Sequence, residues 1–131
     1  PFTLKFGRKT LRGDSTMDTR LSYQNIIKRV LQEHAEFRSR GVDPVKSYPV
    51  FDDQHGRYLI IDRGWEPKQY WHANPIHLEV IDDKIWIQQD ETEDGIAIDL
   101  LGAGVPKEDI VLGFRPPHLR KYTGFASIES P

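Results

Sequence analysis

The chain has 131 residues, of which 37% are hydrophobic and 29% charged, the balance of a soluble globular domain rather than of a disordered segment. It contains no cysteine, which excludes disulfide frameworks, thiolate zinc sites and cysteine nucleophiles. No apolar run reaches the roughly 18 residues of a membrane span and no signal peptide is visible, so we expect a cytoplasmic protein without a membrane partner.

The formal net charge of −2 is unevenly distributed along the chain. Residues 1–16 hold four basic residues and one acidic residue, which leaves 14 basic and 19 acidic side chains for residues 17–131. Such an acidic body is a poor electrostatic match for the phosphate backbone of DNA. We expect residues 1–16 to be a mobile basic extension and residues 17–131 to form one domain. Contact of the extension with nucleic acid is the less favoured alternative.

An amphipathic helix is predicted from Met17 onward, with Gly41 and Pro44 ending it. Its apolar residues recur near the helical period while charged residues fill the other side, so the helix needs a sheet or a second helix to cover one stripe. The members of that stripe are Leu21, Ile26, Ile27, Val30, Leu31 and Phe37.

Two hairpins are predicted next. Residues 45–52 and 57–63 read as strands joined by a polar turn, and Pro49 favours an edge position for the first of them. Residues 70–81 and 84–89 form the second pair, joined by a tight turn at Asp82-Asp83 and with a kink expected at Asn74-Pro75.

The last part of the chain predicts a second helix and a fifth strand. Thr92 is the expected N-cap of a short helix that ends at Gly102 and Gly104, and residues 110–114 read as the strand. Together the elements predict an α+β fold, with an N-terminal helix and a second helix packed on one face of a mainly antiparallel sheet of about five strands.

Alternation along the second hairpin singles out a candidate docking surface. Ile76, Leu78 and Val80 alternate with residues that would lie on the other face of the sheet. An exposed tryptophan among polar neighbours is typical of a protein-binding surface, whereas a tryptophan packed beneath a loop or the chain terminus is the competing interpretation. The residues predicted to bind a partner are His77, Glu79, Trp86 and Gln88.

The loop at Pro116-Pro117 carries the only basic cluster after residue 16, namely Arg115, Arg120 and Lys121. Such a cluster is a candidate anion or nucleic-acid patch, and a solvated, partly paired surface is the alternative.

Other polar groups have weaker claims to chemistry. The acids of residues 90–94 lack the spacing of a calcium loop, His72 and His77 would lie on opposite faces of a regular strand, and Glu66-Pro67-Lys68 has the spacing of a nuclease element but contains a proline. We therefore predict no catalytic residue, cofactor or metal, and no enzymatic activity.

A resemblance to a known family rests on several short motifs between Gly64 and Ala126. They are Gly64-Trp65, Ile76-His77-Leu78, residues 84–88 (KIWIQ), Thr92-Glu93, Gly95-Ile96-Ala97, residues 104–107 (GVPK), residues 110–114 (IVLGF), Pro116-Pro117 and residues 122–126 (YTGFA). With the first helix included, residues 17–126 resemble the XisI family of fdxN-element excision controlling factors, best known from cyanobacteria. One departure is Glu91, which stands where the family pattern has glycine.

The resemblance implies an accessory role in the programmed excision of a DNA element during heterocyst differentiation. It also implies a companion of the XisH family, which itself resembles a nuclease, and it supplies no catalytic residues. Two hypotheses remain: control of that companion through protein contact, and direct DNA binding through the basic loop. DNA contact would be indirect or weak under the first, and self-association is possible under either.

Overall fold

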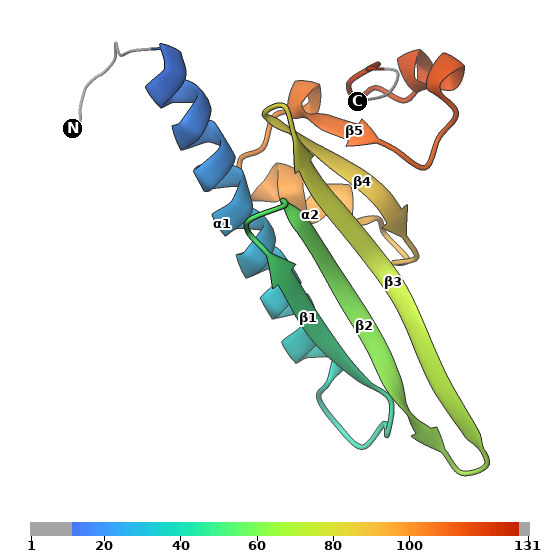
Figure 1. Ribbon diagram of the computed structural model, residues 1–131. Helices are drawn as coiled ribbons and strands as arrows, with labels where there is room; N and C mark the ends of the chain where they lie inside the picture. The colour runs from blue at the N-terminus through green and yellow to red at the C-terminus, as the bar shows by residue number, and fades with distance from the viewer. Residues whose placement is uncertain (1–11, 129–131) are drawn as a thin grey trace.

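The computed structural model describes residues 12–128, in which a long helix lies along one face of a five-stranded sheet (Figure 1). The expectations for residues 1–11 lie outside this described range. The elements are α1 (Arg12–Arg38), β1 (Lys46–Asp52), β2 (Arg57–Glu66), β3 (Gln69–Ile81), β4 (Lys84–Asp90), α2 (Ile96–Gly102), η1 (Lys107–Asp109), β5 (Ile110–Leu112) and η2 (Pro117–Tyr122).

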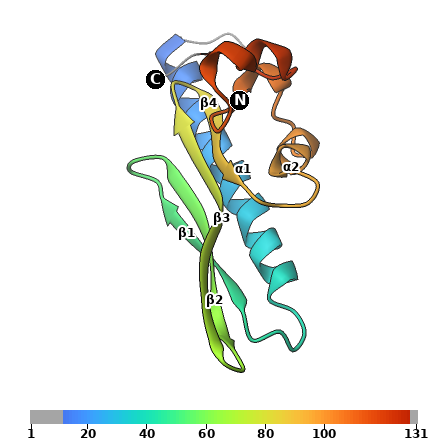
Figure 2. The same ribbon diagram turned by 90° about the vertical axis from the view of Figure 1, so that its right-hand side faces the viewer.

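The sheet follows the chain order β1-β2-β3-β4-β5. The first four strands pair antiparallel as a meander of three hairpins, and β5 pairs parallel to β4, with Trp86 opposite Val111. A parallel pair needs a crossover connection, and α2 occupies it. Both helices lie on the same face of the sheet (Figure 2), so the predicted α+β architecture is confirmed.

The core lies between the helices and the sheet because each element presents apolar side chains at its own period. The buried residues of α1 recur three to four positions apart, while those of β2 and β3 largely alternate; in β4, Ile85 and Ile87 face the helices. Burying one such side chain completely stabilises the fold by about 1.5–3 kcal/mol. The fully or almost fully buried members include Ile27, Leu31, Tyr58, Ile60, Ile76, Leu78, Ile85, Ile87, Ile96, Leu100 and Ile110.

Helix α1 begins at Arg12, five residues before the predicted start at Met17. Residues 12–16 contain no apolar side chain, so the hydrophobic period that identifies the rest of the helix is absent from this turn. The far end agrees with prediction, because the helix ends at Arg38 and Gly41 follows with a φ of 85°.

The turn between β3 and β4 has the geometry that its sequence predicts. Asp82 and Asp83 have φ values of 50° and 64°, which two-residue hairpin loops of type I′ require. Aspartate tolerates this left-handed region better than most residues, so the turn fixes the register of the hairpin.

Strand β3 contains a bulge at the predicted kink. Ile60 pairs with Ile76, whereas Asp62 pairs with Ala73, so β3 has one extra residue at Asn74-Pro75. The extra residue interrupts the alternation of side chains along β3. His72 consequently shares a face with His77, and the expectation that they lie on opposite faces is wrong.

The N-cap prediction for α2 is also wrong. The helix begins at Ile96 behind Gly95, and Thr92 instead accepts a hydrogen bond from the Gly95 amide at 3.1 Å. The carboxylate of Asp90 accepts the Ile96 amide at 2.7 Å and the Thr92 amide at 3.0 Å. Asp90 thus satisfies the first free amide of the helix, because the loop folds back on the end of β4.

Among the described residues, no helix is both long and apolar enough to cross a membrane.

Candidate functional site

Trp86 is the centre of the predicted docking surface, yet its side chain is only 3% exposed. Arg120 of η2 covers it, with the guanidinium carbon 5.1 Å from the centroid of the indole ring. The C-terminal segment that holds Arg120 lies beside β5 (Figure 1). The expectation of an exposed tryptophan is therefore wrong, and the alternative of a tryptophan packed beneath the chain terminus describes the geometry.

Arg120 is itself buried and cannot form part of a solvent-facing basic patch. Its guanidinium donates to the carbonyl oxygens of Ile128 at 2.7 Å, Arg115 at 3.1 Å and Gly113 at 3.2 Å. These bonds draw three points of the terminal segment together over the sheet. Arg115 and Lys121 remain exposed, so the predicted patch of three residues contains two that reach solvent.

The other three predicted docking residues form a half-buried polar network. Glu79 accepts a hydrogen bond from Gln88 at 3.3 Å and lies 2.9 Å from the Nε2 atom of His77. Gln88 also lies against Gly113, where an added Cβ would come within 2.5 Å of its amide oxygen. The network supports the loop that carries η2, and only its outer edge faces solvent.

Over β1, β2 and β3, none of residues 12–128 covers the same face of the sheet. Cross-strand pairing places Tyr48 opposite Ile61, Val50 opposite Leu59 and Trp65 opposite Tyr70. Side chains directly opposite each other share a face. We call this the open sheet face and define it by Tyr48, Val50, Leu59, Ile61, Arg63, Trp65 and Tyr70.

Aromatic rings dominate the open sheet face. The side chains of Trp65 and Tyr70 are 66% and 45% exposed, and their ring centroids lie 5.2 Å apart. The guanidinium carbon of Arg63 lies 4.4 Å from the centroid of the Tyr48 ring. Exposed Trp, Tyr and Arg are the residues most enriched in the energetic centres of protein interfaces. The alternation of residues 59–65 places Arg63 and Trp65 on one face of the strand, and this pattern could have indicated the surface from the sequence.

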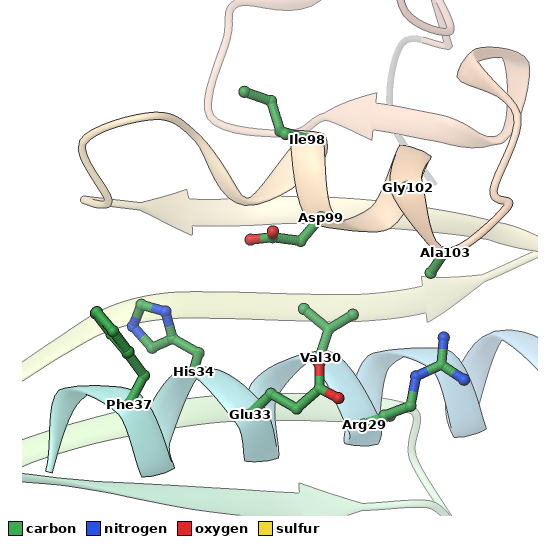
Figure 3. Close-up of a pocket in the computed structure, with 9 residues that line it drawn as sticks. All are labelled: Arg29, Val30, Glu33, His34, Phe37, Ile98, Asp99, Gly102 and Ala103. Carbon is green, nitrogen blue, oxygen red and sulfur yellow. The ribbon is translucent and has the colours of Figure 1, made fainter. Parts of the chain in front are cut away.

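A concave region lies between α1 and α2 (Figure 3), and we call it the interhelical groove. One pocket of about 630 Å³ and an adjoining one of about 470 Å³ share His34, Phe37 and Asp99 in their walls. Burial lowers the pKa of His34, and Arg38 nearby lowers it further. The imidazole is therefore neutral at physiological pH.

Groups with weaker claims to chemistry have structural partners. Asp62 is buried and accepts hydrogen bonds from Ser47 and, at 3.1 Å, from Arg38, so it is not free to join Glu66 and Lys68 in a nuclease-like site. Within residues 12–128, no three His, Asp or Glu side chains gather closely enough to hold a metal ion.

The elements and surfaces together define a small α+β protein whose two helices cover one face of a five-stranded sheet and whose other face is partly open. The chain belongs to the XisI family, because the family model described as XisI protein matches residues 17–127.

Two solved structures support the family and the fold. A XisI-like protein from Anabaena variabilis is 32% identical with a TM-score of 0.75, and the match covers 82% of this chain and 97% of that one. The fdxN element excision controlling factor XisI from the same organism is 30% identical with a TM-score of 0.70, with coverage of 83% and 98%. Among curated proteins, no sequence matches the chain at a significant level.

Proposed function

We propose that this protein is a non-enzymatic accessory factor in the excision of a DNA element, and that it works by binding a nuclease-like companion of the XisH family. The excision role is suggested by its relative, the fdxN element excision controlling factor of Anabaena variabilis. Contact with a protein, rather than catalysis, is the part that the geometry of this chain supports.

The observation that carries the proposal is the open sheet face. Over β4 the chain covers its own sheet with Arg120 and the C-terminal segment, whereas over β1–β3 nothing in the described residues does so. An antiparallel sheet tolerates one solvated face when that face is polar. This face carries Trp65, Tyr70, Tyr48 and Val50, all more than a third exposed, so a partner that buries them would gain apolar contact area.

Co-expression with the companion, followed by purification and size-exclusion chromatography, tests the proposal. We expect one complex, and we expect Trp65→Ala to raise the Kd at least about tenfold, the equivalent of about 1.4 kcal/mol. Tyr122→Ala is the matched control, because Tyr122 is an exposed aromatic residue outside the open sheet face. A companion that elutes separately at micromolar concentration would refute the proposal.

Direct DNA binding through the basic loop and self-association through the open sheet face are the two alternatives to binding of the companion. Of the basic loop only Arg115 and Lys121 reach solvent, so a salt-dependent DNA shift that is lost in the Arg115→Ala, Lys121→Ala double variant would favour the first. A dimer in light scattering that dissociates in Trp65→Ala would show that a second copy covers the open sheet face.

A further inference from the structure

Apolar and charged side chains lie next to each other in the walls of the interhelical groove. Val30, His34 and Phe37 form one stripe of α1, and Asp99 of α2 and Ala103, the residue that follows the helix, form the facing wall. Figure 3 shows the His34 ring and the Asp99 carboxylate turned toward the space between the helices, with Phe37 beside them. Phe37 is 68% exposed, so its ring forms an apolar rim, and the guanidinium carbon of Arg40 lies 5.6 Å from the centroid of that ring. Only the ring face away from Arg40 is therefore left for a partner.

The charge around the groove is predominantly negative. Five carboxylates line its two pockets against two guanidinium groups, those of Arg29 and Arg38. Arg38 is already engaged, because it donates to Asp62 at 3.1 Å. The side chain of Asp99 has no hydrogen bond or ion pair among those the described residues make, and it stands where both pockets meet. The acidic members are Glu33, Glu91, Glu93, Asp94 and Asp99.

His34 carries one buried polar atom that the described residues leave unpaired. Its Nε2 atom is the only buried side-chain nitrogen or oxygen among the described residues without a hydrogen-bond partner. Buried polar atoms in native proteins are almost always paired, and an unpaired one is commonly satisfied by an ordered water or an ion. A neutral imidazole needs a donor at its unprotonated nitrogen.

We propose that the interhelical groove binds a basic segment of the partner protein, with an arginine side chain over the Phe37 ring and paired with the carboxylate of Asp99. A guanidinium fits because it stacks on an aromatic face and pairs with a carboxylate through two parallel hydrogen bonds. The acidic residues of the loop before α2 attract the other cations of the segment. The inference rests on the proposed function, because it specifies the chemistry by which the companion is recognised.

The first experiment measures the Kd of the purified pair for Asp99→Asn and Phe37→Ala. We expect each to weaken binding about five- to thirtyfold, with a shallower salt dependence for Asp99→Asn, since an interfacial charge pair is lost. Glu108→Gln is the matched control, because Glu108 is an exposed acid of η1 outside the groove. Unchanged melting temperatures establish that all three variants fold.

The outcomes separate the two proposals. A companion that binds equally well to Asp99→Asn, Phe37→Ala and Glu108→Gln overturns the groove and leaves the proposed function standing. A companion that does not bind any form refutes the proposed function.

If the companion binds no form of the protein, a peptide ligand still tests whether the interhelical groove binds arginine. An acetylated peptide of alternating arginine and leucine should shift the NMR signals of the His34 ring and the Asp99 and Ala103 amides saturably. The copy with citrulline in place of arginine should not shift them. Equal shifts with both peptides, or no shift with either, overturn the assignment.

Discussion

The guanidinium carbon of Arg120 lies 5.1 Å from the centroid of the Trp86 indole ring, so a cation from the C-terminal segment covers a tryptophan of the sheet. The same guanidinium donates to three carbonyl oxygens of that segment. One side chain therefore both covers the sheet and holds the segment that covers it. Among the described residues, this segment is what covers the outer face of the sheet at Trp86.

Replacement of Arg120 by alanine should destabilise the protein by about 2–4 kcal/mol, because it removes three charge-assisted, part-buried hydrogen bonds and the buried contact with Trp86. Urea unfolding measures this loss. Lys121→Ala is the control, because Lys121 is the cation next to Arg120 and is exposed. This substitution should change stability by about 0.5 kcal/mol or less. Equal effects of the two substitutions would contradict the role assigned to Arg120.

Replacement of Asp90 by alanine should cost about 1–2 kcal/mol, because Asp90 accepts the Ile96 and Thr92 amides. Asp94→Ala removes an equal charge from an exposed position of the same loop and should be nearly neutral. Thermal unfolding of both variants checks the difference. If Asp94→Ala proves the more harmful, the loss reflects the charge of the loop rather than capping.

Replacement of Gly64 by alanine should be strongly destabilising, because its Cβ would stand 2.3 Å from the Pro44 carbonyl oxygen, which is backbone and cannot move aside alone. We expect a loss of about 2–4 kcal/mol by chemical denaturation. Gly102→Ala is the control: a Cβ there meets nothing within 4 Å, so the change should be neutral or should stabilise the helix end by up to about 1 kcal/mol. A well-folded Gly64→Ala protein of unchanged stability would show that the Pro44 loop is not packed there.

The stability of the protein should decrease in mildly acidic solution because of His34. Burial lowers the pKa of this imidazole in the folded protein, so the unfolded chain binds its proton more readily. Stability is therefore complete above the unfolded pKa of about 6.5 and is lost as the pH falls from there through the lower folded pKa. In His34→Asn this loss should disappear.

The acid limb at lower pH provides an internal check on that measurement. The pKa of Asp52 is lowered mainly by a hydrogen bond from the His55 amide, and that of Asp53 mainly by a hydrogen bond from Lys28. Both carboxylates stabilise the fold above their unfolded pKa of about 3.9, and this contribution is lost as the pH falls below it. The low-pH limb should be the same in His34→Asn; a His34→Asn profile that matches the wild type at every pH would contradict the buried imidazole.

Local patterns in the sequence predict most of the fold. The period of α1, the alternation along β3 and β4 and the aspartate pair at 82–83 act over a few residues, so each can be read without knowing what lies nearby in space. The first residues of α1, 12–16, lack such a pattern, so the sequence does not predict this start of the helix.

The errors at the candidate sites concern contacts that the local pattern does not show. Trp86 alternates as an outward-facing residue, and only the position of Arg120, 34 residues later, shows that it is covered. Asp90 caps a helix across a loop, where the adjacent Thr92 has the stronger local signal. The interhelical groove lies between two helices that the four antiparallel strands separate in the sequence, so no local pattern indicates that these helices meet. Its residues His34 and Asp99 have no motif in common.

The three tryptophans of the chain differ in exposure, so intrinsic fluorescence can report separately on the surface and on the interior of the protein. Trp65 and Trp71 are 66% and 45% exposed, whereas Trp86 is 3% exposed beneath Arg120. Iodide should quench the first two and leave the blue-shifted emission of Trp86. A ligand on the open sheet face would then protect Trp65 from the quencher, while release of the C-terminal segment would move the Trp86 emission to longer wavelength. One cuvette experiment can distinguish an event on the outside of the sheet from an opening of the protein itself.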